Sequence, residues 1–366
     1  HSMSESPSAQ WPAGSGVEYL YAAGLWIGAS VNGLPSVSTG YPETEFYPPL
    51  DERETIYRSF EGDYGGNRYP RKADDDGDGL VDEDWLNGRD DDGDGLIDED
   101  FAGIGKQMFS CWFTDDQPNA SSIWPEHSPM HLHVRQESYQ WGEEQYNNFV
   151  ATHYEITNIG NDFLTSVYIG IYADVDAGPV NYGSYHRDDH VGLWEGAHCA
   201  IWGNGQKPIN MSIAYVYDND GDDGLTPGYF GIMPLGYAFR GFGTNYPPSS
   251  SLATFRTFQS LLSFEDGGEP TNDFERYQVL SSRVKDPDSD VANDYRILIS
   301  VGPIGYLPPG ATIVFDLAYV CGEGLDGMIE NASRAKLVYD GTWHDADNDP
   351  STGINGRETP VAGPLK

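Results

Sequence analysis

The chain has 366 residues, enough to bury a sizeable core as one large domain or two ordinary ones without cross-links. Its 20 Lys and Arg against 58 Asp and Glu give a formal net charge of -38, which makes nucleic acid and anionic membranes poor partners, because proteins bind both through basic side chains. The 24 Tyr, 9 Trp, 44 Gly and 24 Pro favour a sheet protein with many turns over a helical bundle.

The first predicted elements form a β hairpin. Residues 19–30 are apolar and aromatic, Asn32 and Gly33 supply the pair of positive-φ residues that a tight turn needs, and 35–39 return as a second strand. Residues 41–72 are rich in Pro, Gly, Tyr and charge without a clear period, which indicates a long surface excursion.

This excursion leads into two near-copies of one acidic sequence, DDDGDGLVDED at 74–84 and DDDGDGLIDED at 90–100. Fourteen carboxylates fall within these 27 residues, and Arg89 is the only basic residue among them. Such loops repel themselves strongly unless cations lie between the carboxylates. We therefore predict a duplicated calcium-loop insert at 72–101; an acidic, solvated linker is the alternative.

Calcium takes six to eight oxygen ligands, and alternating aspartates on a tight, glycine-containing loop direct their carboxylates to one point. The apolar pair in each copy (Leu80 with Val81, and Leu96 with Ile97) is expected to pack inwards. The predicted ligands include the backbone carbonyls of the two leucines and are Asp74, Asp76, Asp78, Leu80 and Asp82 in the first copy and Asp90, Asp92, Asp94, Leu96 and Asp98 in the second.

The loops are not EF-hands, because the twelfth position holds Trp85 in one copy and Phe101 in the other instead of a bidentate Glu. The expected substitutes as closing ligands are Asp84 and Asp100, or Glu83 and Glu99. The pattern resembles the calcium loops of thrombospondin type 3 repeats, which carry DxDxDGxxDxxD, although the last acid is out of register here and the repeat interval is longer.

Strand character returns at 105–113. Three successive segments at 131–141, 148–158 and 164–174, rich in Val, Ile, Tyr and Thr, predict a meander. A further strand pair is predicted at 192–202 and 209–217, and single strands at 295–301 and 312–320. Apolar residues recur at helical spacing in 252–262, 274–280 and 328–338.

Other acidic runs are weaker candidates for calcium. Asp218, Asp220 and Asp222 form the best of them, although no Gly stands in the sixth place. The runs at 286–290 and 345–349 are less convincing, since Asp-rich turns are common without metal. A site shared between 174–176 and 188–189, across two loops, is a further hypothesis.

No nucleophile elbow, P-loop, HExxH or Cys-His signature is present, and three distant cysteines without a CxxC give neither a zinc ribbon nor a thioredoxin-type site. His131, His133 and His153 are candidates for zinc. His133, Arg135 and Tyr139, spaced along one strand face, are the candidate residues for the alternative of a polysaccharide lyase.

The segments YAAGLWIGASVNG, HVRQESYQWGEEQYNNFVATHYEITNIGNDFLTSVYIGIYADVDAGP and RILISVGPIGYLPPGATIVFDLAYVCGEGL, with NASRAKLVYDG after them, resemble large secreted proteins of Bacteroidetes-related bacteria. Those proteins often end in a type IX secretion sorting domain, and none is recognisable before Lys366. The resemblance implies an extracellular or cell-surface location. No signal peptide and no membrane-spanning run is visible, and residues 1–3 look like the end of an expression tag.

We thus expect a mainly β protein, a large antiparallel β-sandwich-like domain with a few short helices, in which 4–71 and 102–366 form one domain and 72–101 are inserted. The expected function is that of a calcium-binding structural or adhesive module at the cell surface, with glycans or other surface proteins as partners and the oligomeric state left open. The alternatives are a secreted carbohydrate-active enzyme, either a lyase or a hydrolase, and a non-catalytic glycan-binding module with structural calcium.

Overall fold

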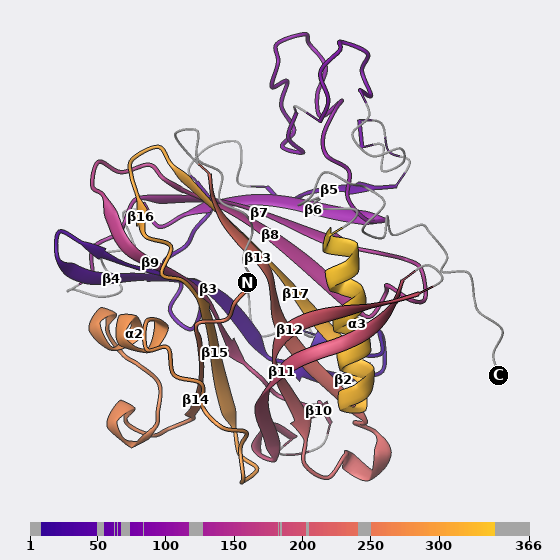
Figure 1. The fold of residues 1–366 in the computed structure, drawn as a ribbon. Helices are drawn as coiled ribbons and strands as arrows, with labels where there is room; N and C mark the ends of the chain where they lie inside the picture. Colours follow the sequence, from indigo (N-terminus) through magenta and orange to yellow (C-terminus); the bar gives the residue numbers. More distant parts are fainter. Residues whose placement is uncertain are drawn as a thin grey trace.

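The computed structural model describes residues 9–49, 55–61, 63, 65–66, 74–82, 84–116, 127–181, 183, 185–202, 205–240 and 250–340. This part of the chain is mainly β, with antiparallel strands in three sheets and two α-helices, as expected from the sequence. The two large sheets pack against each other through one apolar core, and each carries a helix on its outer side (Figure 1). Residues 1–3, Glu83 and the acidic run at 345–349 lie outside the described residues.

The strands are distributed over the sheets as follows. The eight-stranded sheet consists, from edge to edge, of β11 (Asp189–Trp202), β12 (Gly205–Asp218), β13 (Gly228–Arg240), β17 (Thr312–Glu323), β8 (Phe149–Asn158), β7 (Leu132–Gln140), β6 (Gln107–Thr114) and β5 (Tyr57–Phe60). The six-stranded sheet consists of β14 (Thr254–Gln259), β15 (Tyr295–Val301), β9 (Leu164–Asp174), β3 (Ala22–Val31), β4 (Leu34–Thr39) and β16 (Tyr306–Leu307), which pairs with β9. The small sheet consists of β1 (Ala9–Gln10), β2 (Val17–Leu20) and β10 (Gly178–Pro179). The helices are α2 (Asp273–Leu280) and α3 (Gly324–Val338), with 3-10 turns η1 (Tyr185–Arg187), η2 (Asp222–Gly224) and η3 (Phe264–Asp266).

The layers follow from side-chain alternation along the strands. In β7, Leu132 and Val134 point into the core between the sheets, whereas Arg135, Glu137 and Tyr139 point to the outer face. The outer face of the eight-stranded sheet is covered by α3, and that of the six-stranded sheet by α2. Both helices were expected from the spacing of their apolar residues.

The β3–β4 hairpin also matches the expectation, because Asn32 and Gly33 both have positive φ, 51° and 88°. The pair β11–β12 is confirmed over its full length.

The spacing at 252–262 was misinterpreted as helical; the segment contains β14. Phe255 and Phe258 lie on opposite faces of this strand, and both are buried because one faces the inter-sheet core and the other faces α2. Burial on both faces removes the period of two that would have revealed a strand. Leu261, expected on the same helix face, is 97% exposed.

The expected meander is only half correct. β7 and β8 pair with each other, but β9 crosses to the other sheet and pairs with β3 and β15, while the free side of β8 pairs with β17. The turn at 158–162 therefore connects the two sheets. No helix in the described chain is long and apolar enough to span a membrane.

Candidate calcium loops

The acidic insert lies in the connection between β5 and β6, which pair as neighbours at one edge of the eight-stranded sheet, and its two loops project beyond the sandwich (Figure 1). Its base is anchored. Leu86 and Phe101, 5% and 2% exposed, belong to the apolar cluster beneath α3. The Asp84 amide donates to the Asp100 carbonyl (2.9 Å), and the Phe101 amide donates to the Gly65 carbonyl (2.9 Å).

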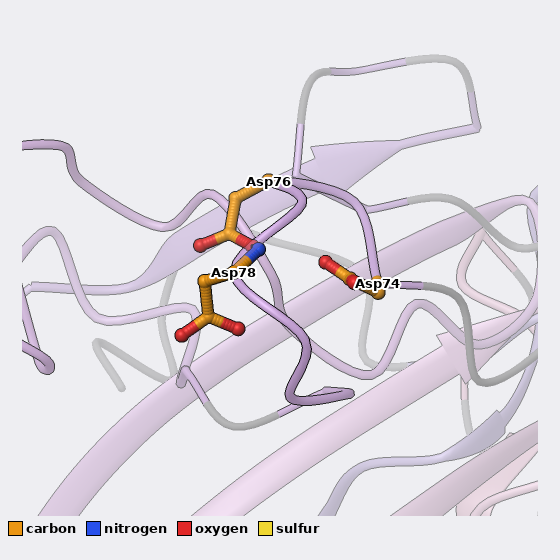
Figure 2. Close-up of side chains that lie close together, drawn as sticks. All are labelled: Asp74, Asp76 and Asp78. Atoms are coloured by element: carbon orange, nitrogen blue, oxygen red, sulfur yellow. The ribbon is translucent and has the colours of Figure 1, made fainter.

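The first loop turns its aspartates onto its own backbone. The Gly77 amide donates to Asp74 Oδ1 (2.6 Å) and the Gly79 amide to Asp74 Oδ2 (3.1 Å). The amides of Asp78 and Leu80 donate to Asp76 (2.9 Å) and Asp78 (2.6 Å). Each of these three aspartates has an oxygen within 4.8 Å of the others, and Figure 2 shows the side chains gathered around this loop.

The second loop repeats this arrangement bond for bond. The amides of Gly93 and Gly95 donate to the two oxygens of Asp90 (2.6 and 2.9 Å), and the Asp92 and Asp94 carboxylates accept from the amides two residues further on (2.9 and 2.7 Å). These three carboxylates also lie within 4.8 Å of one another. The glycine at the sixth position has a φ of 99° in the first loop and 102° in the second, a conformation that glycine adopts without strain.

The electrostatics of these loops favour a cation. The six aspartates accept hydrogen bonds from amides of their own loops, and within the described chain they form no ion pair. Unit charges 4.8 Å apart repel by about 0.9 kcal/mol in bulk water, so the three pairs of one loop cost about 2.6 kcal/mol before salt screening. A divalent cation converts this repulsion into attraction.

Glu99, one of the expected closing ligands, provides a second observation. Its side chain is 1% exposed, and within the described chain neither of its oxygens accepts a hydrogen bond. Burial, together with the nearby carboxylates of Asp84 and Asp94, raises the pKa of Glu99 above its ordinary value. A buried carboxylate without a hydrogen-bond donor, beside the third aspartate of the second loop, is well suited to a bound cation.

The other predicted residues of the insert are placed differently. Asp98 turns back and accepts from the amides of Asn87 (2.6 Å) and Gly88 (2.9 Å), so it lies outside the three-carboxylate group and ties the two copies together. Asp84 and Asp100 are buried at the base, and Asp82 has a φ of 54° like its counterpart Asp98 at 52°. None of these four belongs to a cluster of converging carboxylates in the described chain.

The leucines do not pack inwards. Leu80 and Leu96 are 56% and 46% exposed, and the Val81 and Ile97 that follow them are exposed as well. Each leucine amide donates to the aspartate at the fifth position of its loop, Asp78 or Asp94, and the apolar side chain lies at the loop surface. The expectation of an inward-packing pair is therefore wrong.

In the acidic turn after β12, Asp218 and Asp220 come together as expected, but with a different third member. Their oxygens lie within 4.8 Å of one from Asp188, which precedes β11. The Asp222 carboxylate instead accepts a hydrogen bond from the Thr226 hydroxyl (2.7 Å) and is outside this group. The sequence had not associated Asp188 with Asp218 and Asp220.

The residues considered for catalysis belong to an internal network. Arg135 is paired with Glu137 (2.5 Å) and Glu155 (3.1 Å), and the Tyr139 hydroxyl donates to Glu137 (2.5 Å). Burial and the Glu137 charge raise the pKa of Tyr139 well above its ordinary value, which disfavours the tyrosinate a lyase would use as a base. Trp85 of the insert covers Arg135, with 5.3 Å between the guanidinium carbon and the ring centroid.

The three histidines proposed for zinc do not converge. His131 pairs with Asp116 (2.8 Å) at the surface, and His153 pairs with Asp316 (2.5 Å) in the interior. Among the described residues, no histidine ring nitrogen belongs to a group of three ligand atoms within 4.8 Å of one another.

One aromatic cluster bears on glycan binding. The rings of Tyr217 and Tyr229 stack with centroids 4.5 Å apart, and His190 stacks on Tyr217 at 5.3 Å. Both faces of the Tyr217 ring are therefore covered, so a sugar cannot stack on this ring.

Fold and site together define a mainly antiparallel β protein with paired acidic loops at one sheet edge. A scan against protein-family models found no match, and a search of curated proteins found none either. Its function must therefore be argued from the residues themselves.

Proposed function

We propose that this chain is a calcium-binding structural or adhesive protein of the cell exterior, in which calcium rigidifies the two acidic loops. The observation that carries the proposal is the duplication of geometry: each loop holds three aspartate oxygens within 4.8 Å, and within the described chain these aspartates accept bonds from amides of their own loop and form no ion pair. Alternating aspartates with a glycine turn are the donor set that calcium prefers, because it tolerates flexible, all-oxygen coordination.

The donor set favours calcium over magnesium. Magnesium demands near-ideal octahedral geometry and retains several waters, whereas the buried Glu99 beside the second loop is suited to displacing water. The loops are exposed, which agrees with the weak, millimolar sites of extracellular modules. An exterior location supplies calcium at that level.

The adhesive part of the proposal rests on what the insert presents. Its loops project from a sheet edge and carry Leu80, Val81, Leu96 and Ile97 at about half exposure among many carboxylates. Ordering such loops before contact would reduce the entropy cost of binding a surface glycan or protein. The core of the sandwich then serves as the rigid support.

Elemental analysis, melting curves and limited proteolysis test the proposal. Protein dialysed against calcium should retain the ion, and chelator should lower the melting temperature or expose the 70–101 segment to protease. Magnesium at the same concentration is the matched control and should protect less. Protein that retains no calcium and gives the same melting and digestion patterns in chelator would refute the proposal.

A further inference from the structure

A second concentration of carboxylates lies on the side of the sandwich away from the insert, near β10 (Figure 1). Here β11 begins and β12 ends, and Asp189 stands directly opposite Asp218 in the antiparallel register. Cross-strand partners share a face, and each lies two residues from a valine, Val191 or Val216, that faces the inter-sheet core. Both carboxylates are therefore directed into the end of the sandwich, where they are 0% and 5% exposed.

A third and a fourth carboxylate complete this group. Oxygens of Asp188 and Asp220 lie within 4.8 Å of each other and of one from Asp218. Asp218 Oδ1 accepts hydrogen bonds from the amides of Asp220 (3.0 Å) and Gly221, whereas neither amide bonds to Oδ2, which remains available as a ligand atom.

Three carboxylate oxygens at this end of the sandwich have no hydrogen-bond donor in the described chain. Asp218 Oδ2, Asp189 Oδ2 and Asp188 Oδ1 are all buried and accept no hydrogen bond from the described chain. None of these side chains forms an ion pair there. The positive charge of His186 acts on Asp188 without pairing with it, and the His186 ring accepts a hydrogen bond from the Arg187 guanidinium (3.2 Å). Two of the four carboxylates, those of Asp189 and Asp218, are buried, and buried carboxylates without a counter-charge are strongly unfavourable in the ionised form.

In a neighbouring cluster of carboxylates, a basic side chain of the protein supplies the neutralising charge. Asp174, Asp176 and Asp294 also converge within 4.8 Å, but Arg296 lies against them and pairs with Asp174 (3.2 Å) and with Asp294. The group at Asp188 and Asp218 has no equivalent of Arg296 among the residues with described positions. Within the described part of the chain, no basic side chain supplies the charge that would neutralise this group.

We propose that Asp188, Asp218 and Asp220 bind a calcium ion, with Asp189 as a buried fourth carboxylate, independently of the loops in the insert. The ion fixes the start of β11 to the end of β12. Asp189 connects this end of β11 to the segment that follows β9, because its Oδ1 accepts a hydrogen bond from the Ala177 amide (3.1 Å). The site thus holds the two sheets together at this end.

Calcium stoichiometry by equilibrium dialysis, with melting curves in calcium and in chelator, tests this site. Asp218→Asn keeps Oδ1 as an acceptor for the loop amides and removes the charge. We expect it to bind one calcium fewer than the parent, to melt no lower than the parent in chelator, and to lose part of the calcium-dependent rise. Asp223→Asn removes an exposed charge from the same turn and should behave as the parent.

The double variant Asp74→Asn/Asp90→Asn separates this inference from the proposed function. It should lose the calcium of the insert and keep the calcium at Asp218. A double variant that binds no calcium would overturn the second site. A double variant that binds as much calcium as the parent would overturn only the proposed calcium sites in the insert loops. An Asp218→Asn protein with the full calcium complement would also overturn the second site. If that variant does not fold, anomalous diffraction from parent crystals grown in calcium decides: a peak between Asp188 and Asp218 supports the site, and its absence refutes it.

Discussion

Replacing Asp90 with asparagine should separate two contributions to the stability of the second loop: that of bound calcium and that of hydrogen bonds from the loop's own backbone. In the calcium-free protein, Asn keeps the bond from the Gly93 amide but cannot accept from the Gly95 amide, now 2.9 Å from Oδ2, a loss of about 1 kcal/mol. It also abolishes two of the three carboxylate repulsions, a gain of about 1.7 kcal/mol before screening. In chelator the variant should therefore unfold within about 1 kcal/mol of the parent.

In calcium the two proteins should differ clearly. With a dissociation constant of about 0.1 to 1 mM, typical of extracellular modules, about 10 mM calcium stabilises the parent through this loop by roughly 1.4 to 2.7 kcal/mol. In Asp90→Asn, loss of the first ligand should weaken calcium binding about 100-fold, so that calcium stabilises the variant through this loop by less than about 0.5 kcal/mol. Chemical denaturation at both calcium levels measures the difference.

The matched control is Asp75→Asn, which removes the same charge from the sister loop at a position outside its three-carboxylate group. It should respond to calcium as the parent does. If Asp90→Asn and Asp75→Asn respond alike, the calcium effect arises from general charge reduction, and the assignment of Asp90 as a ligand is wrong.

Two further predictions concern how the insert and the sheet are held. Trp85→Ala removes the ring over Arg135 and should accelerate proteolysis in the insert about 5- to 30-fold, equivalent to roughly 1 to 2 kcal/mol. The control is Phe163→Ala, which removes an exposed aromatic ring elsewhere and should not accelerate proteolysis in the insert. Equal cleavage of the two variants would contradict the anchoring role of Trp85. Burial lowers the pKa of His153, but Asp316 at 2.5 Å more than compensates and raises it to about 9. The resulting stabilisation is complete below pH 6.5 and is lost as the pH rises through 9. The difference in unfolding free energy between the parent and His153→Gln should therefore shrink by about 3 kcal/mol across that range. A difference that does not change with pH would disprove the charged pair.

The parts of the site that could be predicted from sequence are those set by neighbours in the chain. Within each insert loop, the glycine and aspartate spacing alone determines which carboxylates meet, and the named triplets do converge. Glu99, one of the alternative closing residues expected from the sequence, lies near Asp94 for the same reason.

The parts that could not be predicted depend on strand register. Asp188 joins Asp218 only because β11 and β12 pair over 14 residues, which brings together positions 30 residues apart. Asp222 was expected in its place, but a hydrogen bond from Thr226 holds its carboxylate away. The same limitation explains β14, whose two buried faces depend on layers contributed by distant segments.

The position of the insert also affects how the sheet meets other molecules. β5 is a four-residue strand at the edge of the eight-stranded sheet, and its outer backbone groups are the type of surface onto which another chain can add a strand. The acidic insert lies in the connection that follows this strand, so a second copy of the protein that approaches the edge meets a dense group of like charges before it can form backbone hydrogen bonds with β5. A short edge strand flanked by charge is a recognised way for β proteins to resist edge-to-edge aggregation.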